Sequence, residues 1–149
     1  MPWRLSFATS AAVVVVITFG IAFGLGAYTF VYARGYSYLS HDPGACANCH
    51  VMGEHFDAWN KSSHKAVATC NDCHTPHNLV GKYMTKARNG FWHSFYFTTG
   101  RYPDPLRITE RNRRITEGAC RACHTEMTAV IGADADCVRC HRYVGHEVR

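Results

Sequence analysis

The sequence predicts a mainly α-helical chain with much irregular structure, in which one N-terminal transmembrane helix precedes a compact domain. Three observations support this fold class. The stretch from Leu5 to Ala33 contains no charged residue. Behind it, the motif Cys-x-x-Cys-His occurs four times and uses all eight cysteines of the 149-residue chain. The roughly 120 residues that remain are few for a conventional apolar core. We therefore expect an N-terminus and anchor in residues 1–35 and a compact domain in residues 36–149.

Each of the four motifs indicates one covalently attached haem of the c type. Two thiols at this spacing can bond to the haem vinyl groups, and the histidine that follows is placed to ligate the iron from one side. Paired Cys-x-x-Cys sequences also occur in zinc sites and in disulfides, but neither gives a reason for a histidine after every second cysteine. With about 30 residues per haem, the haems are expected to form the core of the domain. The attachment cysteines are Cys46, Cys49, Cys70, Cys73, Cys120, Cys123, Cys137 and Cys140.

The uncharged N-terminal stretch is long enough to cross a membrane. About 29 residues at 1.5 Å rise per residue reach roughly 40 Å, whereas the apolar part of a cleaved signal peptide has about 7–15 residues. Trp3 at one end and tyrosines from Tyr28 onward at the other are typical of membrane interfaces. The flanking charges of Arg4 and Arg34 are nearly balanced, so the haems set the orientation, because bacteria attach c-type haem on the periplasmic side. We expect a single-pass signal anchor in the bacterial inner membrane, with the haem domain in the periplasm.

The spacing of the motifs divides the compact domain into two halves. The motif cysteines begin at positions 46 and 70 in one pair and at 120 and 137 in the other. This pattern predicts dihaem units at about 41–77 and 118–146, joined by a helical insertion at 78–117.

Three helices are expected in this domain. The longest follows the turn at Pro76, is weakened at Gly90 by about 1 kcal/mol relative to alanine, and ends at Gly100 before a Pro-rich stretch. The expected ranges are Glu54–Ser63, Asn78–Phe97 and Ile108–Glu117.

The formal net charge of +5 does not indicate nucleic-acid binding. It leaves out the haem propionates, and the sequence has no separate basic patch interleaved with aromatic residues on a recognisable fold. The arginines between Arg101 and Arg114 either meet propionates or a partner, or form a solvated face.

Ten histidines supply more axial ligands than the motifs use. Low-spin haems need a second ligand on the far side of the iron. His64, six residues before Cys70, is a good candidate. His146 follows His141 too closely to reach across the same haem, so we expect it to ligate another one. His77 follows His74 by three residues and has the same geometric limit. The motif histidines are His50, His74, His124 and His141; the spare ones are His41, His55, His64, His77, His93 and His146, of which His41 and His55 are expected at the surface.

Met52 sets the first motif apart from the other three. It follows His50 by two residues, a tether too short to wrap to the opposite face of the same haem. Either Met52 replaces His50 as the iron ligand on that face, or it only packs against the porphyrin. A thioether ligand would raise the reduction potential relative to a second imidazole.

A polar stripe runs along the helix expected at 78–97. Lys82, Lys86, Asn89 and His93 are spaced by four, three and four residues, which places them on one face. The stripe is either a solvated face or the lining of a site where protons leave a substrate. Oxidation of a quinol needs such a site, because two electrons pass to a haem and two protons to acceptors such as histidine.

The order of these motifs resembles the NapC/NirT family of c-type cytochromes. The resemblance rests on Cys-x-x-Cys-His-x-Met directly after one anchor, on Cys70-Asn-Asp-Cys73-His74-Thr-Pro-His77, on the lysine-rich helix and on a last motif with a histidine five residues on. It is strongest for the short tetrahaem members, which are membrane subunits of cytochrome c nitrite reductase. The resemblance implies that Met52 ligates the first haem with His50 displaced, and that the lysine of the quinol site is Lys86, with Lys82 nearby.

In one respect the chain departs from this family. An acidic residue near the open face of the first haem in some members corresponds to His93 here, so His93 is either the proton acceptor or a sixth ligand. The family also implies that one distal ligand can be a lysine of the partner.

The resemblance to this family implies a menaquinol dehydrogenase subunit. The chain would pass electrons through four haem c groups to a periplasmic multihaem nitrite reductase catalytic subunit, as part of a hetero-oligomer in respiratory nitrite ammonification. Terminal reduction of nitrite would take place on the partner. Two alternatives remain: a general electron-transfer hub from quinol to several periplasmic acceptors, and a membrane-tethered haem sensor.

Overall fold

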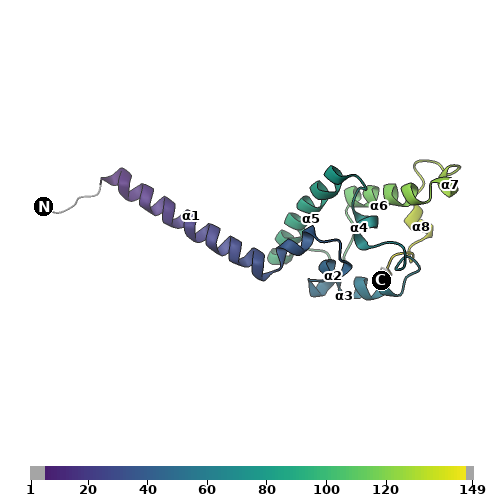
Figure 1. Ribbon diagram of the computed structural model, residues 1–149, viewed down its shortest axis with the longest axis horizontal. Helices are drawn as coiled ribbons and strands as arrows, with labels where there is room; N and C mark the ends of the chain where they lie inside the picture. Colours follow the sequence, from purple (N-terminus) through teal and green to yellow (C-terminus); the bar gives the residue numbers. More distant parts are fainter. Residues whose placement is uncertain (1–5, 147–149) are drawn as a thin grey trace. The chain divides into compact units, whose positions relative to one another are not determined.

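The computed structural model describes residues 6–146, and over this range it is helical, with no β-strand. This confirms the predicted fold class (Figure 1). The chain forms two compact units that divide between Tyr36 and Ser37. The expectations for Trp3 and Arg4 lie outside the described residues.

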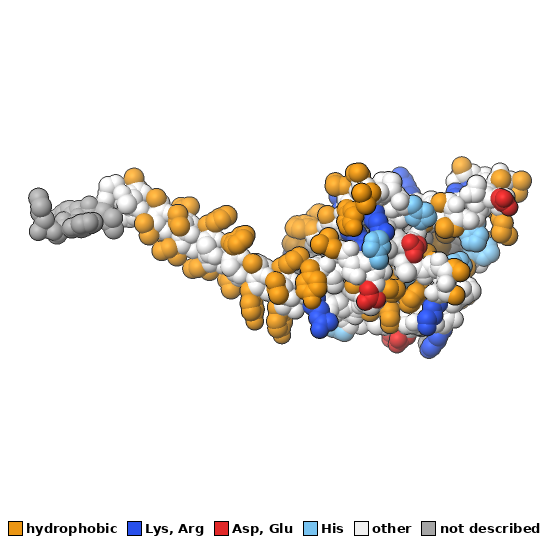
Figure 2. Space-filling model, viewed as in Figure 1, with side chains coloured by type: hydrophobic (Ala, Val, Ile, Leu, Met, Phe, Trp, Pro, Cys, Tyr) orange, Lys and Arg blue, Asp and Glu red, His pale blue; other side chains and the backbone are white. Residues whose placement is uncertain are grey.

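The first unit is a single long helix, α1 (Phe7–Tyr32). Its 26 residues correspond to about 39 Å at 1.5 Å per residue. Hydrophobic side chains cover the face of α1 that Figure 2 shows, and none of its described residues is buried. A helix that is apolar all round and long enough to cross a bilayer is a membrane span when no protein covers it. Near its end the rings of Tyr28 and Tyr32 stack with centroids 5.9 Å apart.

The second unit, the haem unit, consists of short helices joined by irregular segments. Its packing is built mainly on the contact between α4 and α6. In chain order the elements are η1 (Gly35–Leu39), α2 (Pro43–Cys46), η2 (His50–Met52), α3 (Gly53–Asn60), α4 (Cys70–His74), α5 (Leu79–Thr99), α6 (Glu110–Cys123), α7 (Thr125–Thr128) and α8 (Cys137–Cys140).

Local signals explain the limits of α5. The side chain of Asn78 caps its first turn by accepting a hydrogen bond from the amide of Gly81 at 2.7 Å. Gly100 ends the helix in the left-handed conformation with φ 66°, which glycine adopts without strain. The predicted helix is thereby confirmed, two residues longer at its C-terminus.

The other predicted helices differ from the structure at their ends. α3 ends at Asn60 rather than at Ser63. α6 begins at Glu110, capped by the Thr109 hydroxyl, and continues through the third motif to Cys123. The sequence predicts a helix over Ile108–Glu117 that leads into the third motif, so α6 begins two residues later and ends six residues later than predicted.

The polypeptide of the haem unit buries almost no apolar side chain. Among the described residues, Ala119 is the one buried hydrophobic residue, while the buried polar ones are Asn71, Thr75, Thr85 and Lys86. Domains of this size normally depend on a hydrophobic core. The sparse core agrees with the expectation that covalently held haems serve in its place.

Candidate haem sites and a polar cluster

The helices place the two cysteines of each motif for attachment to one porphyrin. Residues three apart on a helix lie on the same face. The second motif forms α4, the third forms the end of α6, and the fourth forms α8. His124 is the C-cap of α6, and His141 is the C-cap of α8. The first motif is more open, with Cys46 at the end of α2 and Cys49 just before η2. None of the eight cysteines, all of which lie in the described part of the chain, forms a disulfide.

In two pairs of histidines, the distance between the ring centres is close to that of two ligands on one iron atom. The ring centroids of His74 and His146 lie 6.0 Å apart, with the rings 14° from parallel. Those of His64 and His124 lie 6.2 Å apart. Two imidazoles on opposite sides of one metal, with metal–nitrogen bonds of roughly 2 Å, would have ring centres roughly 6 Å apart. Each pair joins a motif histidine to a spare one, so the residues fit haems with two histidine ligands.

The hydrogen bonds of His64 leave its Nε2 atom available to bind iron. Its Nδ1 lies 3.1 Å from the carbonyl oxygen of Val144 and 3.2 Å from the hydroxyl of Ser63. An Nδ1–H that donates to a carbonyl leaves Nε2 as the metal-binding atom, which is the usual arrangement of a ligating histidine. The sequence does not show this contact, because Val144 is 80 residues away.

The His74–His146 pair is held in the neutral form, which is the form that binds iron. Burial, and then repulsion from His146, lower the pKa of His74 to about 4. Burial also lowers the pKa of His146, with His55 as the second cause. Neutral imidazole is the ligating form. The ring centroid of His55 lies 5.0 Å from that of His146. The Nδ1 atom of His55 is buried and has no hydrogen-bond partner among residues 6–146. The prediction that His55 is a surface residue is therefore wrong.

In the first motif, His50 is packed against aromatic residues. Its ring meets Phe97 edge-on at 5.8 Å between centroids, and Phe97 in turn stacks on Tyr102 at 6.0 Å. Met52 ends η2 and is partly exposed. That Met52 and not His50 ligates the iron of the first haem stays a prediction.

The remaining histidines have other neighbours. The Nε2 atom of His77 lies 3.0 Å from the carbonyl oxygen of Asp72, in its own motif. His141 has no second histidine in ring contact among residues 6–146. His41 is exposed, and its Nδ1 accepts a hydrogen bond from the Lys82 ammonium at 3.0 Å.

The polar stripe of α5 faces partly into the haem unit, because Lys86 is buried and Lys82 and Asn89 are half-buried, while His93 is exposed. Lys86 is only 7 % exposed and donates to the carbonyl oxygen of Ser40 at 2.5 Å. Burial, and then the neighbouring Lys82 cation, lower the pKa of Lys86. At the next position of the stripe, the Asn89 side chain accepts a hydrogen bond from Asn112 of α6 at 3.3 Å. The interpretation of the stripe as a solvated face is therefore wrong for Lys86.

His93 closes the stripe beside a tyrosine that sequence reasoning missed. The hydroxyl of Tyr38 lies 3.3 Å from Nδ1 of His93. Burial, and then the thiols of Cys49 and Cys46, raise the pKa of Tyr38 to about 12, which places this ring beside the first motif. Desolvation lowers the pKa of His93. The one signal in the sequence for a role of Tyr38 in this site is its position directly after the anchor. The sequence analysis interprets the tyrosines there as residues of the membrane interface.

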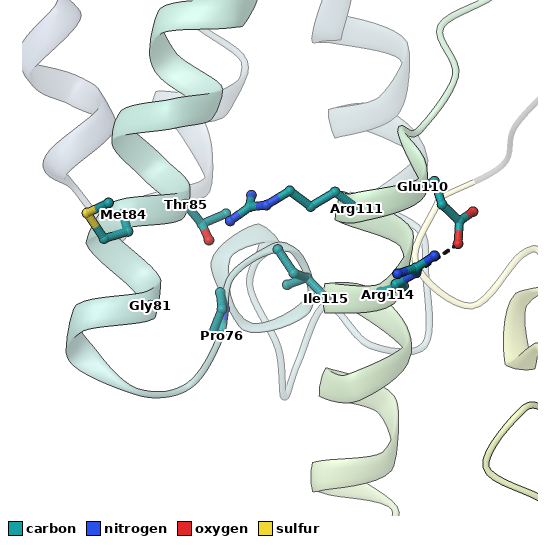
Figure 3. Close-up of a pocket in the computed structure, with 8 residues that line it drawn as sticks. All are labelled: Pro76, Gly81, Met84, Thr85, Glu110, Arg111, Arg114 and Ile115. Carbon is teal, nitrogen blue, oxygen red and sulfur yellow. Dashed lines mark hydrogen bonds and ion pairs between the residues drawn. The ribbon is translucent and has the colours of Figure 1, made fainter.

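An open pocket of about 550 Å³ lies between α5 and α6. Figure 3 shows Arg111 reaching from α6 toward Thr85, while Arg114 pairs with Glu110 at 3.0 Å on the same helix. The polar stripe occupies a different face of α5, so this pocket is separate from the cluster around Lys86. Its lining residues are Pro76, Gly81, Met84, Thr85, Glu110, Arg111, Arg114 and Ile115.

Comparison with known proteins agrees with this geometry. The model of the NapC/NirT cytochrome c family, N-terminal region, matches residues 6–149. The chain is 38% identical over 146 residues to the cytochrome c-type protein NrfH of Wolinella succinogenes, a match that covers 87% of this chain and 82% of the relative. It is 36% identical over 118 residues to the cytochrome c nitrite reductase subunit NrfH of Nitratidesulfovibrio vulgaris, covering 76% and 72%.

The fold is also similar to a solved structure. The crystal structure of the cytochrome c nitrite reductase NrfHA complex bound to the HQNO inhibitor contains a chain that matches with a TM-score of 0.66 and 29% identity, covering 89% of this chain and 90% of that one. The four haem-attachment motifs, the opposed histidine pairs and these matches together show that the chain is a membrane-anchored, haem-binding member of the NapC/NirT cytochrome c family.

Proposed function

We propose that this chain is the quinol-oxidising subunit of a cytochrome c nitrite reductase. It takes electrons from menaquinol at the inner membrane and passes them through four haem c groups to a periplasmic catalytic subunit, which reduces nitrite to ammonium. The names of the two NrfH relatives support this assignment. The observation that carries it in the chain itself is the buried ammonium of Lys86 in a polar cluster beside the first haem motif.

The ring contacts support an assignment of the ligands of two haems. We assign Met52 to the first haem, the His74–His146 pair to the second, and the His124–His64 pair to the third. His141 holds the fourth, and its distal ligand would come from the catalytic subunit. Bound haem supplies iron that accepts and releases one electron at a time.

The chain's own residues handle the protons. Oxidation of one quinol to quinone releases two electrons and two protons. The Lys86 ammonium donates a hydrogen bond to a quinol oxygen and stabilises the negative charge that forms there when the proton leaves. His93 accepts a proton, and Tyr38 holds its ring. Lys82 with His41 forms a second polar pair one turn away, and Asn89 anchors the stripe to α6.

The test is the variant Lys86→Ala in the full-length, haem-loaded chain in lipid nanodiscs. Haem reduction by a soluble menaquinol analogue should be lost, while dithionite should still reduce all four haems. Lys65→Ala, at an exposed lysine between the first two motifs, is the matched control and should behave as wild type. Unchanged quinol kinetics in Lys86→Ala would overturn the proposed site.

A second experiment separates this function from that of a general hub. Purification from native membranes should yield one stoichiometric multihaem nitrite reductase. Recovery of several unrelated acceptors would favour the hub, and a chain that no quinol can reduce would favour the haem sensor.

A further inference from the structure

The longest helix of the haem unit has its apolar face turned outward. Val80, Met84, Phe91 and Phe95 are spaced by four, seven and four residues, so they share one face, which we call the outer face of α5. Val80 is 74 % exposed and Met84 and Phe91 are each 64 % exposed. Figure 2 shows hydrophobic side chains uncovered along this helix.

The polar stripe occupies the opposite side of the same helix. Lys86 and His93 lie about half a turn around the axis from Met84 and Phe91 at 100° per residue. Their partners, Ser40 and Tyr38, belong to the haem unit itself. A helix on the surface of a soluble domain has the reverse arrangement, with its apolar stripe toward the core. An exposed apolar patch of this kind marks a surface with a partner.

Connectivity of the chain holds this helix near the membrane. α1 ends at Tyr32, and Tyr38 follows six residues later. Six residues span roughly 20 Å at most. Tyr38 contacts the middle of α5, where its ring lies 3.4 Å from the position of a Cβ on Gly90 and its hydroxyl meets His93. At most six residues of chain therefore separate the end of the membrane span from a residue that contacts α5.

The side chains beside the outer face suit a bilayer surface. Trp92 and Tyr96 stack at 5.4 Å between centroids, next to the stacked pair of Phe91 and Phe95 at 6.4 Å. Trp and Tyr concentrate at the headgroup level because one end of each ring system is apolar and the other polar. The exposed Arg88, adjacent to the face, can pair with anionic lipid headgroups.

We propose that the outer face of α5 docks on the lipid bilayer and inserts its apolar side chains at the boundary between headgroups and acyl chains. The haem unit then has an interfacial attachment in addition to α1. The inference rests on the anchoring of the chain and not on the oxidation of quinol. One consequence is that the polar stripe lies about one helix diameter, roughly 10 Å, from the lipid.

The test uses the full-length, haem-loaded chain in nanodiscs that contain a phospholipid with a photoreactive diazirine in its acyl chain. After illumination, mass spectrometry maps the labelled residues. α1 should be labelled, and Val80, Met84, Phe91 and Phe95 should be labelled several-fold more than Met127 and Val130. These two apolar residues, in and just after α7, are 73 % and 93 % exposed and serve as internal controls.

Matched variants make the result decisive. Met84→Glu with Phe91→Glu should remove the label from α5 and leave that of α1, with an unchanged dithionite-reduced haem spectrum as evidence of folding. Met127→Glu with Val130→Glu should change neither label. The proposal fails if wild-type α5 is labelled no more than α7. It also fails if α5 is covered by a second copy or by the catalytic subunit, which cross-links between chains would show. Because quinol turnover is not measured, failure of the proposed site at Lys86 leaves this result unaffected.

Discussion

The hydroxyl of Tyr38 lies 3.3 Å from Nδ1 of His93, and its ring packs over Gly90 one turn earlier on α5. Burial raises the pKa of the tyrosine to about 12, so the hydroxyl stays protonated at physiological pH. With Nδ1 engaged, Nε2 is the atom that His93 presents to other groups. A residue just beyond the anchor thus orients the histidine that ends the polar stripe.

Tyr38→Phe should slow haem reduction by a menaquinol analogue roughly fivefold. The change removes only the hydroxyl, and a hydrogen bond of this kind contributes about 1 kcal/mol net. Stopped-flow absorbance in nanodiscs measures the rate. Tyr36→Phe, in the same short helix and exposed, is the control and should leave the rate unchanged. A rate in Tyr38→Phe equal to wild type would show that the hydrogen bond has no part in orienting His93.

The parts of this fold that sequence reasoning predicted depend on local signals. The uncharged run specifies α1, Asn78 and Gly100 specify the ends of α5, and four-residue spacing places Lys82 and Lys86 on one face. Each of these signals acts within a few turns of the chain, so it can be read without knowledge of the fold.

The parts that could not be predicted depend on contacts between distant segments. His64 meets His124 and His146 meets His74 across 60 and 72 residues, and the path of the chain around the haems decides these pairings. Tyr38 meets His93 across 55 residues. The sequence analysis places His55 at the surface, but its ring contacts His146, which lies at the far end of the chain.

Met52→His should lower the reduction potential of one haem, because a second imidazole stabilises the oxidised iron more than a thioether does. His50→Phe should leave all four potentials unchanged, since the His50 ring packs against Phe97 and a phenyl ring can take its place there. Redox titration followed by electron paramagnetic resonance measures both. If His50→Phe shifts a potential and Met52→His does not, the ligand of the first haem is the histidine of the motif.

His64→Gln should convert one haem from low spin to high spin, because the iron opposite His124 loses its distal imidazole. The amide keeps a donor for the Val144 carbonyl, so the fold should persist. His77→Gln is the matched control, since its Nε2 faces the Asp72 carbonyl and its loss should leave the spin states unchanged. Electron paramagnetic resonance of the oxidised chain counts the low-spin signals; equal counts in His64→Gln and wild type would contradict the pairing.

Glu117 stabilises the fourth motif, and this contribution should depend on pH. Its carboxylate accepts hydrogen bonds from the amides of Cys137 at 3.0 Å and Val138 at 3.4 Å, at the start of α8. Burial favours a higher pKa for Glu117, but the hydrogen bonds that its carboxylate accepts at the start of α8, among them those from the amides of Cys137 and Val138, outweigh it, and the net pKa is lowered from 4.5.

A lowered pKa means that the stabilisation is fully present above about pH 4.5, the ordinary value for Glu117, and is lost as pH falls through the lower pKa of the folded state. Glu117→Gln should therefore reduce the free energy of unfolding by about 1 kcal/mol at pH 7. At pH values below the folded-state pKa, the variant and the wild type should have equal stability. Guanidinium unfolding followed by circular dichroism, repeated from pH 7 down to pH 3, gives the difference. Glu126→Gln, at an exposed carboxylate of α7, should show no such pH dependence. A constant difference between Glu117→Gln and wild type over the whole range would mean that the carboxylate charge has no part in capping α8.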